Sequence, residues 1–90
     1  MKGQRVRVFK WIEWNLQKID NHGLSPEDVE SAFDRVLQIQ RRRDGSFQMY
    51  AEAPNGRRIW VIWRFDREEP GQFDFLTEIA DPPIFVITAY

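Results

Sequence analysis

Residues 11–36 read WIEWNLQKIDNHGLSPEDVESAFDRV, and this stretch predicts two helices joined by a tight turn. Gly23 comes where a left-handed C-terminal cap favours a residue without a Cβ atom. Ser25 is a preferred N-cap residue, and Pro26 suits the first position of the helix that follows. We therefore expect the first helix to end just before Gly23 and the second to begin at Pro26.

Apolar spacing predicts which face of each helix is buried. Between residues 11 and 22, apolar side chains recur at i, i+4 and i+7, and a similar spacing recurs from residue 26 onward. The expected core positions are Ile12, Leu16 and Ile19 in the first helix and Val29, Ala32, Phe33 and Val36 in the second. A further stripe, expected at the edge of the core, comprises Trp11, Asn15, Lys18 and His22.

The remaining chain has strand patterns. Strands are expected at residues 4–10, 36–42, 47–53, 57–65 and 84–90. Asp44-Gly45 and Asn55-Gly56 are tight-turn signals that join the middle three strands into hairpins. Residues 73–79 fit either a strand or an ordered excursion. The fold class is therefore α+β, with an N-terminal strand and two helices packed on a mostly antiparallel sheet of four to five strands.

Two-residue turns in both hairpins would fix which side chains share a face of the sheet. One face would then be uniformly apolar and covered by the helices: Leu37, Ile39, Tyr50, Ile59, Val61, Trp63 and Phe65. The other face would mix arginines, glutamines and aromatics: Gln38, Gln40, Arg42, Phe47, Met49, Ala51, Arg58, Trp60, Ile62 and Arg64. The mixed face suits a binding partner. A slip of one residue in either turn would swap these assignments.

Composition restricts the classes of function. Ninety residues predict a single domain, residues 1–90, and the absence of cysteine excludes disulfides and thiolate metal sites. A lone histidine without an acidic cluster predicts no metal site, and no cofactor is expected because no phosphate-binding glycine loop or nucleophile–histidine–acid set is present. Neither a signal peptide nor a membrane span is apparent, so a cytoplasmic protein is expected.

The charges are unevenly distributed although the formal net charge is only −1. Arginines dominate between Arg35 and Arg67, whereas the charged residues after Arg67 are all acidic. The basic block is either the footprint of an anionic partner or a well-solvated hairpin surface.

A family resemblance spans the helical stretch. Asn15, Lys18-Ile19, His22-Gly23, Ser25-Pro26 and Val29-Glu30 together resemble the N-x-x-K-I-x-x-H-G-x-S-x-x-x-V-E pattern of the BrnT family. The stretch N-G-R-R-I-W-V-I-W is similar to a hairpin of that family, and the closing I-T-A-Y stands where the family reads like I-S-A-R. BrnT proteins are toxins of bacterial toxin–antitoxin pairs and small ribonucleases of the RelE/ParE-like fold.

The resemblance implies a sheet flanked by the two N-terminal helices, with an RNA-facing surface on its other side. It also implies metal-independent cleavage of mRNA and a cognate antitoxin protein as partner. The candidate catalytic residues are His22, Arg58, Arg64 and Tyr90, and the candidate RNA-binding residues are Lys18, Arg42, Arg58 and Arg64.

Each candidate also has a structural interpretation. His22 is either a general acid or base or a residue that shapes the turn at Gly23. The arginines either hold phosphate or keep the sheet edge from aggregating, and Trp60 and Trp63 either stack on bases or fill the core. A non-catalytic interaction module on the same fold is the alternative function, with an antitoxin or a second copy bound at a Trp60/Met49 surface.

Overall fold

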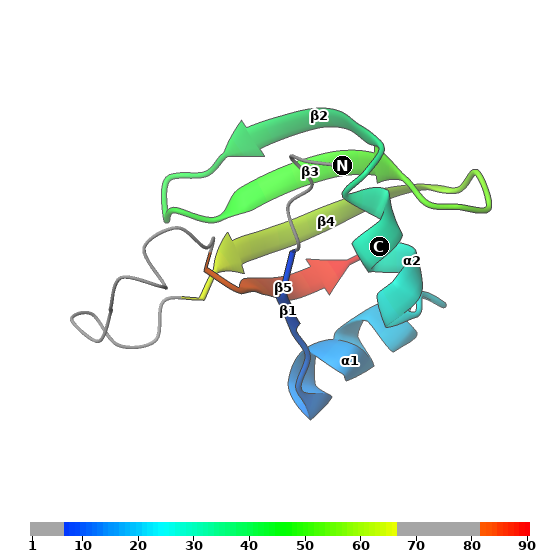
Figure 1. The fold of residues 1–90 in the computed structure, drawn as a ribbon, viewed down its shortest axis with the longest axis horizontal. Helices are drawn as coiled ribbons and strands as arrows, with labels where there is room; N and C mark the ends of the chain where they lie inside the picture. Colours follow the sequence, from blue (N-terminus) through cyan, green and yellow to red (C-terminus); the bar gives the residue numbers. More distant parts are fainter. Residues whose placement is uncertain (1–6, 67–81) are drawn as a thin grey trace, which may run out of the picture.

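The computed structural model describes residues 7–66 and 82–90, which form a small α+β fold with a five-stranded mixed sheet (Figure 1). The elements in chain order are β1 (Phe9–Lys10), α1 (Glu13–Asp20), α2 (Pro26–Ala32), β2 (Val36–Arg41), β3 (Phe47–Glu52), β4 (Arg58–Phe65) and β5 (Ile84–Ala89). The strand order is β1-β5-β4-β3-β2, with β1 parallel to β5 and all other neighbours antiparallel. The predicted fold class is confirmed at this level, while the segment at residues 73–79 lies outside the described residues.

The turn between the helices has the expected chemistry. Gly23 adopts a φ of 73°, the left-handed conformation that disfavours a Cβ atom. The Ser25 hydroxyl accepts a hydrogen bond from the Asp28 amide at 3.2 Å, and the Asp28 carboxylate accepts one from the Ser25 amide at 3.0 Å. This reciprocal capping box fixes the first turn of α2. Gly23 and Ser25 therefore have the conformation and the contact predicted from the sequence for the turn between the helices.

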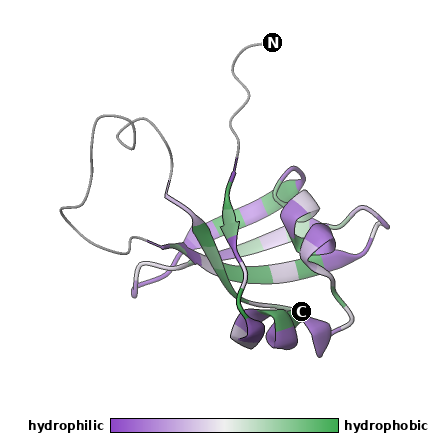
Figure 2. Cartoon of the chain, turned by 60° about the horizontal axis from the view of Figure 1, so that its bottom comes forward, coloured by the Kyte–Doolittle hydropathy of each residue, from purple (hydrophilic) through white to green (hydrophobic). Residues whose placement is uncertain are grey.

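The core lies between the helices and one face of the sheet, which we call the core face. Figures 1 and 2 show α2 lying over this face and α1 lying beside β5. Buried side chains of the helical region meet buried side chains of β3, β4 and β5: Ile19, Leu24, Val29, Ala32 and Phe33 against Met49, Ala51, Ile59, Val61, Trp63, Ile84, Val86 and Ala89. The predictions for Ile19, Val29, Ala32 and Phe33 are confirmed.

The predicted core stripe of α1 is wrong at two of its three positions. Ile12 and Leu16 are 43% and 37% exposed, whereas Asn15 is fully buried. Asn15 and Ile19 are one turn apart, so α1 is rotated toward the stripe that was expected only at the edge of the core. Hydrogen bonds of the Asn15 side chain explain this rotation of α1.

Asn15 joins three backbone segments. Its amide nitrogen donates to the Lys10 carbonyl and to the Val86 carbonyl of β5, both at 3.0 Å. Its side-chain oxygen accepts from the Ile12 amide at 2.7 Å, which caps the start of α1. Because buried backbone groups must be paired, this single amide fixes α1 against the edge of β5.

Both hairpin turns contain three residues rather than two, so the predicted register is wrong. The Arg42 amide bonds the Ser46 carbonyl at 2.7 Å, and the Ala53 amide bonds the Arg57 carbonyl at 2.8 Å. The last loop residues, Gly45 and Gly56, have φ values of 91° and 90°. A turn followed by a glycine at positive φ is the usual three-residue hairpin connection, and it shifts each strand pairing by one position.

Each hairpin shifts the strand pairing by one position. The side chains of β4 therefore keep their predicted face relative to β2, whereas those of β3 lie on the face opposite to the predicted one. Met49 pairs with Val61, and Ala51 pairs with Ile59, so Met49 and Ala51 face the core. Tyr50 pairs with Trp60 and lies on the opposite face, which was expected to carry Met49. Met49 is only 1% exposed, so the predicted Trp60/Met49 partner surface does not exist.

Strand β2 is the outer edge of the sheet, and every one of its residues is exposed. Val36, predicted as a core position of the second helix, is instead the first residue of β2 and is 40% exposed. The helix ends earlier than expected, at Ala32, so the chain enters the sheet before residue 36. The edge strand therefore lies beyond the cover that α2 provides.

Candidate functional site

The sheet face opposite α2, which we call the free face, carries aromatic and basic side chains. Strand alternation assigns to it Gln48, Tyr50 and Glu52 of β3, Arg58, Trp60, Ile62 and Arg64 of β4, and Phe85 of β5. Arg58 and Arg64 are exposed, while Tyr50 and Trp60 are partly exposed. Two arginines therefore bracket an aromatic residue along one strand.

Three aromatic residues cross the free face in a row. The rings of Tyr50 and Trp60 lie 4.8 Å apart between centroids. Trp60 and Tyr90 exchange two backbone hydrogen bonds, at 2.8 and 2.9 Å, so they are directly opposite and share a face. The row Tyr50–Trp60–Tyr90 thus runs across β3, β4 and the end of β5.

His22 and Tyr90, both candidates from sequence, are brought together. Their ring centroids are 5.8 Å apart. The Arg57 guanidinium donates to the His22 carbonyl at 2.9 Å, so it links the turn after α1 to the start of β4. Arg58 is the next residue, and within the described part of the chain its side chain has no hydrogen-bond or ion-pair partner. One end of the free face therefore combines the His22 imidazole, the Tyr90 phenol and the Arg58 guanidinium, whereas Arg57 alternates to the core-face side of the strand.

At the other end of the free face, two stacked aromatic rings lie between two cationic side chains. The Arg64 guanidinium lies 4.7 Å from the Phe85 ring, and Trp14 stacks on Phe85 with centroids 6.0 Å apart and an interplanar angle of 10°. The Lys18 ammonium lies 5.0 Å from the Trp14 ring. Two residues expected separately to bind RNA, Lys18 and Arg64, are thus connected through two aromatic rings.

The six candidate residues form two groups. Arg58 and Arg64 share a face of β4 but are six residues apart, about 20 Å along a strand. Arg42 belongs to the Arg64 end, because Phe47 pairs with Arg41 on one side and with Trp63 on the other. At that separation a single phosphate cannot contact both Arg58 and Arg64.

Sequence reasoning missed three aromatic residues that contribute to these contacts: Trp14 of α1, and Phe85 and Tyr50 of the free face. The i, i+4 spacing of Trp14 and Lys18 on a helix was a usable signal for their contact. Phe85 and Tyr50 required the correct strand register, which the turns determine.

At the end of the free face that contains Arg64, the Asp66 carboxylate forms two ion pairs, with Lys10 and with Arg64. The Lys10 ammonium donates a hydrogen bond to the Asp66 carboxylate at 2.9 Å and lowers the pKa of that carboxyl, with a smaller contribution from Arg64 at 3.5 Å. The Asp66 side chain is 13% exposed, so water screens the Lys10 pair less than it screens a surface pair.

The Asp66 ion pair predicts a pH-dependent stability. Because the folded-state pKa lies below the ordinary value of 3.8, the stabilisation is present above about pH 4 and is lost as the pH falls through the folded pKa. Asp66→Asn should therefore destabilise the protein at pH 7 and have a smaller effect at pH 3, measured by urea unfolding. Asp34→Asn is the matched control, since the Arg7–Asp34 pair is well exposed. Equal effects of Asp66→Asn at both pH values would contradict this assignment.

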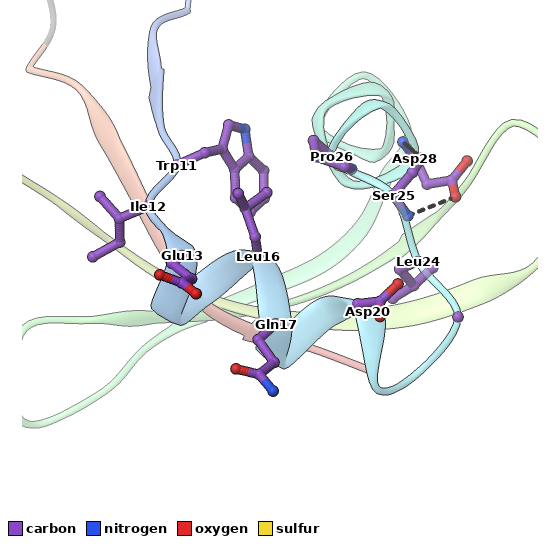
Figure 3. Close-up of a pocket in the computed structure, with 11 residues that line it drawn as sticks. Trp11, Ile12, Glu13, Leu16, Gln17, Asp20, Leu24, Ser25, Pro26 and Asp28 are labelled. Carbon is purple, nitrogen blue, oxygen red and sulfur yellow. Dashed lines mark hydrogen bonds between the residues drawn. The ribbon is translucent and has the colours of Figure 1, made fainter.

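A groove of about 880 Å³ lies between α1 and α2, outside the free face (Figure 3). Its apolar lining includes Trp11, Ile12, Leu16 and Leu24. Its charged lining residues are all acidic: Glu13, Asp20 and Asp28. The groove and the free face thus have opposite charge.

Two further properties concern the described residues, 7–66 and 82–90. Neither helix there is long and apolar enough to cross a membrane. No group of three or more histidine or acidic side chains in these residues is placed to hold a metal ion.

No family model matches the chain, and comparison with curated proteins and with solved structures found no match.

Proposed function

We propose that this protein is a BrnT-like toxin of a bacterial toxin–antitoxin system, acting in the cytoplasm, which binds RNA on its free face and cleaves it without a metal. The observation that carries the proposal is the Tyr50–Trp60 ring pair, bracketed along β4 by Arg58 and Arg64. Aromatic rings stack on unpaired bases of any sequence, and guanidinium groups bind phosphate through two parallel hydrogen bonds. An aromatic pair with an arginine on each side suits single-stranded RNA whose bases face the sheet.

The general architecture supports the same proposal. A RelE/ParE-like fold implies helices on one face of the sheet and RNA on the other. Here α2 and the buried Ile19 of α1 pack on the core face, and the basic and aromatic side chains lie opposite.

The two ends of the free face would have different roles, one in RNA binding and the other in proton transfer. At one end, Arg64, Arg42 and Lys18 hold the RNA backbone. At the other, His22 and Tyr90 stand 5.8 Å apart, a spacing that allows one general base and one general acid to flank a phosphate.

The proposed cleavage is an internal transfer at phosphorus. One of the two groups removes the proton of a ribose 2′-hydroxyl, and the resulting oxygen attacks the adjacent phosphorus. The bond to the 5′-oxygen breaks, and the other group protonates that oxygen. Arg58 stabilises the negative charge that develops on the phosphate oxygens.

RNA affinity tests the binding half of the proposal. Arg64→Ala should weaken binding of a fluorescent single-stranded oligonucleotide about five- to tenfold at low salt, since it removes one charged phosphate contact of about 1–1.5 kcal/mol. Arg41→Ala removes the same charge from the core-face side, where Arg41 lies over Phe47, and should change affinity less than twofold. Equal losses from the two variants would show charge attraction without a site on the free face.

A non-catalytic protein-interaction module is the second candidate function. It is favoured by large apolar side chains that are exposed outside the free face: Ile12, which precedes α1, Leu16 on α1, and Val36, Leu37 and Ile39 on the edge strand β2. An antitoxin or a second copy of the chain would cover one of these surfaces. A protein that remains monomeric in light scattering and captures no antitoxin would contradict this candidate.

A further inference from the structure

We propose that the groove between α1 and α2 binds an amphipathic helix of a protein partner, in which lysines or arginines flank an apolar stripe. This inference is independent of RNA binding, because it concerns another surface with the opposite charge.

The floor of the groove is apolar and open. Ile12 and Leu16 are 43% and 37% exposed, the partly exposed Trp11 adjoins them, and the buried Leu24 lies at the bottom of the groove. Figure 3 shows the Trp11 and Leu16 side chains beside the space between the two helices. Isolated exposed apolar residues are common, but here two of them, Ile12 and Leu16, line the same groove as the partly exposed Trp11.

The spacing of the floor residues fits a helix. Ile12 is the N-cap residue of α1, and its carbonyl accepts a hydrogen bond from the Leu16 amide at 3.0 Å, so the two residues lie within one turn. Apolar residues at i and i+4 on a partner helix also lie within one turn, so they match the length of this apolar surface. The volume of about 880 Å³ admits several such side chains.

The rim of the groove selects the charge of the partner. Glu13, Asp20 and Asp28 line it, and neither lysine nor arginine does. Asp28 already accepts a hydrogen bond from the Ser25 amide, but within the described residues Glu13 and Asp20 have no ion-pair partner. RNA is repelled from such a rim, whereas a lysine- or arginine-bearing helix is attracted.

Asp20, one of the three acidic residues of the rim, also lies at the end of a helix. It is the last residue of α1, where the partial negative charge of the helix dipole disfavours a carboxylate. A cation bound there interacts favourably with both the Asp20 carboxylate and the end of the helix.

The test uses the full chain with ¹⁵N-labelled tryptophan and a synthetic 18-residue peptide of leucine and lysine with leucines at i and i+4. A scrambled peptide of the same composition is the first control. The Trp11 indole N–H donates to Glu30 at 2.7 Å and lines the groove, so its NMR signal should shift on binding, while that of Trp60 on the free face should not. Equal binding of both peptides, or a shift at Trp60 alone, would overturn the proposal.

Two variants that change the net charge equally, one inside the groove and one outside it, separate binding in the groove from general charge attraction. Asp20→Lys should weaken peptide binding more than tenfold, and Asp34→Lys, outside the groove, less than threefold. Leu16→Ser tests the floor and should also weaken binding more than tenfold without loss of RNA affinity. Circular dichroism verifies that each variant is folded, and equal losses from Asp20→Lys and Asp34→Lys would reject the groove. Because RNA affinity is measured in parallel, failure of this proposal is distinguishable from failure of the proposed function.

Discussion

Replacing Asn15 with alanine is expected to lower the free energy of unfolding by about 3 kcal/mol, the largest effect on stability that we predict for a single polar side chain here. The substitution leaves the Lys10 and Val86 carbonyls and the Ile12 amide without the partners they have in the folded protein. A buried polar group left unpaired costs about 1–3 kcal/mol, and relaxation toward water at the partly buried Lys10 and Ile12 contacts recovers some of the total.

Thermal unfolding measures this effect directly. For a domain of this size, about 3 kcal/mol corresponds to a Tm lowered by roughly 10–20 °C. Asn21→Ala is the matched control, because Asn21 follows α1, is exposed, and makes no side-chain hydrogen bond with a described residue. It should change Tm by less than about 3 °C. Similar losses from the two variants would mean that Asn15 does not hold α1 to β5.

Replacing His22 or Arg58 with alanine is expected to reduce RNA cleavage about 100-fold, the largest effect on activity. His22 would lose its role in proton transfer beside Tyr90, and Arg58 would no longer stabilise charge on the phosphate. The His22→Ala protein should keep its RNA affinity within threefold, because the imidazole acts on the reaction more than on binding. The rate is measured with excess protein over a labelled oligonucleotide, in buffer containing EDTA.

Arg41→Ala is the control for the cleavage experiment, since it removes an arginine from the opposite side of the sheet. Its cleavage rate should stay within twofold of the wild type. Wild-type protein that binds RNA but leaves it intact would reject the ribonuclease and favour the non-catalytic module. Induced expression in bacteria provides a parallel readout, in which the wild type should arrest growth and Arg58→Ala should not.

The helical hairpin was predictable from sequence because its signals are local. Gly23, Ser25 and Pro26 act through the backbone of their own turn, so no knowledge of the rest of the fold is required. The orientation of α1 was not predictable in this way. Ile12 and Leu16 have the spacing of a core stripe, but the partners of Asn15 include Val86, which is 71 residues away in the chain. A long-range polar contact therefore overrode the apolar pattern.

The free face was predictable in part. Strands β2 to β5 and both turn positions followed from local signals, whereas the described part of the first strand, predicted at residues 4–10, is only Phe9–Lys10. A two-residue turn and a three-residue turn containing the same Asn-Gly or Asp-Gly pair differ by one position in register. Tyr50 was consequently assigned to the core and Met49 to the partner surface, the reverse of their positions. Arg58, Trp60 and Arg64 kept their predicted face because the two one-residue shifts cancel along β4.

The tryptophan indole signals test the central claim, RNA binding on the free face, most directly. The four tryptophans sample separate regions: Trp60 is in the aromatic row, Trp14 is in the Phe85 stack, Trp11 lines the groove, and Trp63 is buried in the core. Titration with a single-stranded oligonucleotide should shift the ¹⁵N–¹H signals of Trp60 and Trp14 and leave those of Trp11 and Trp63 in place. Shifts confined to Trp11, or no shift at saturating RNA, would contradict the account.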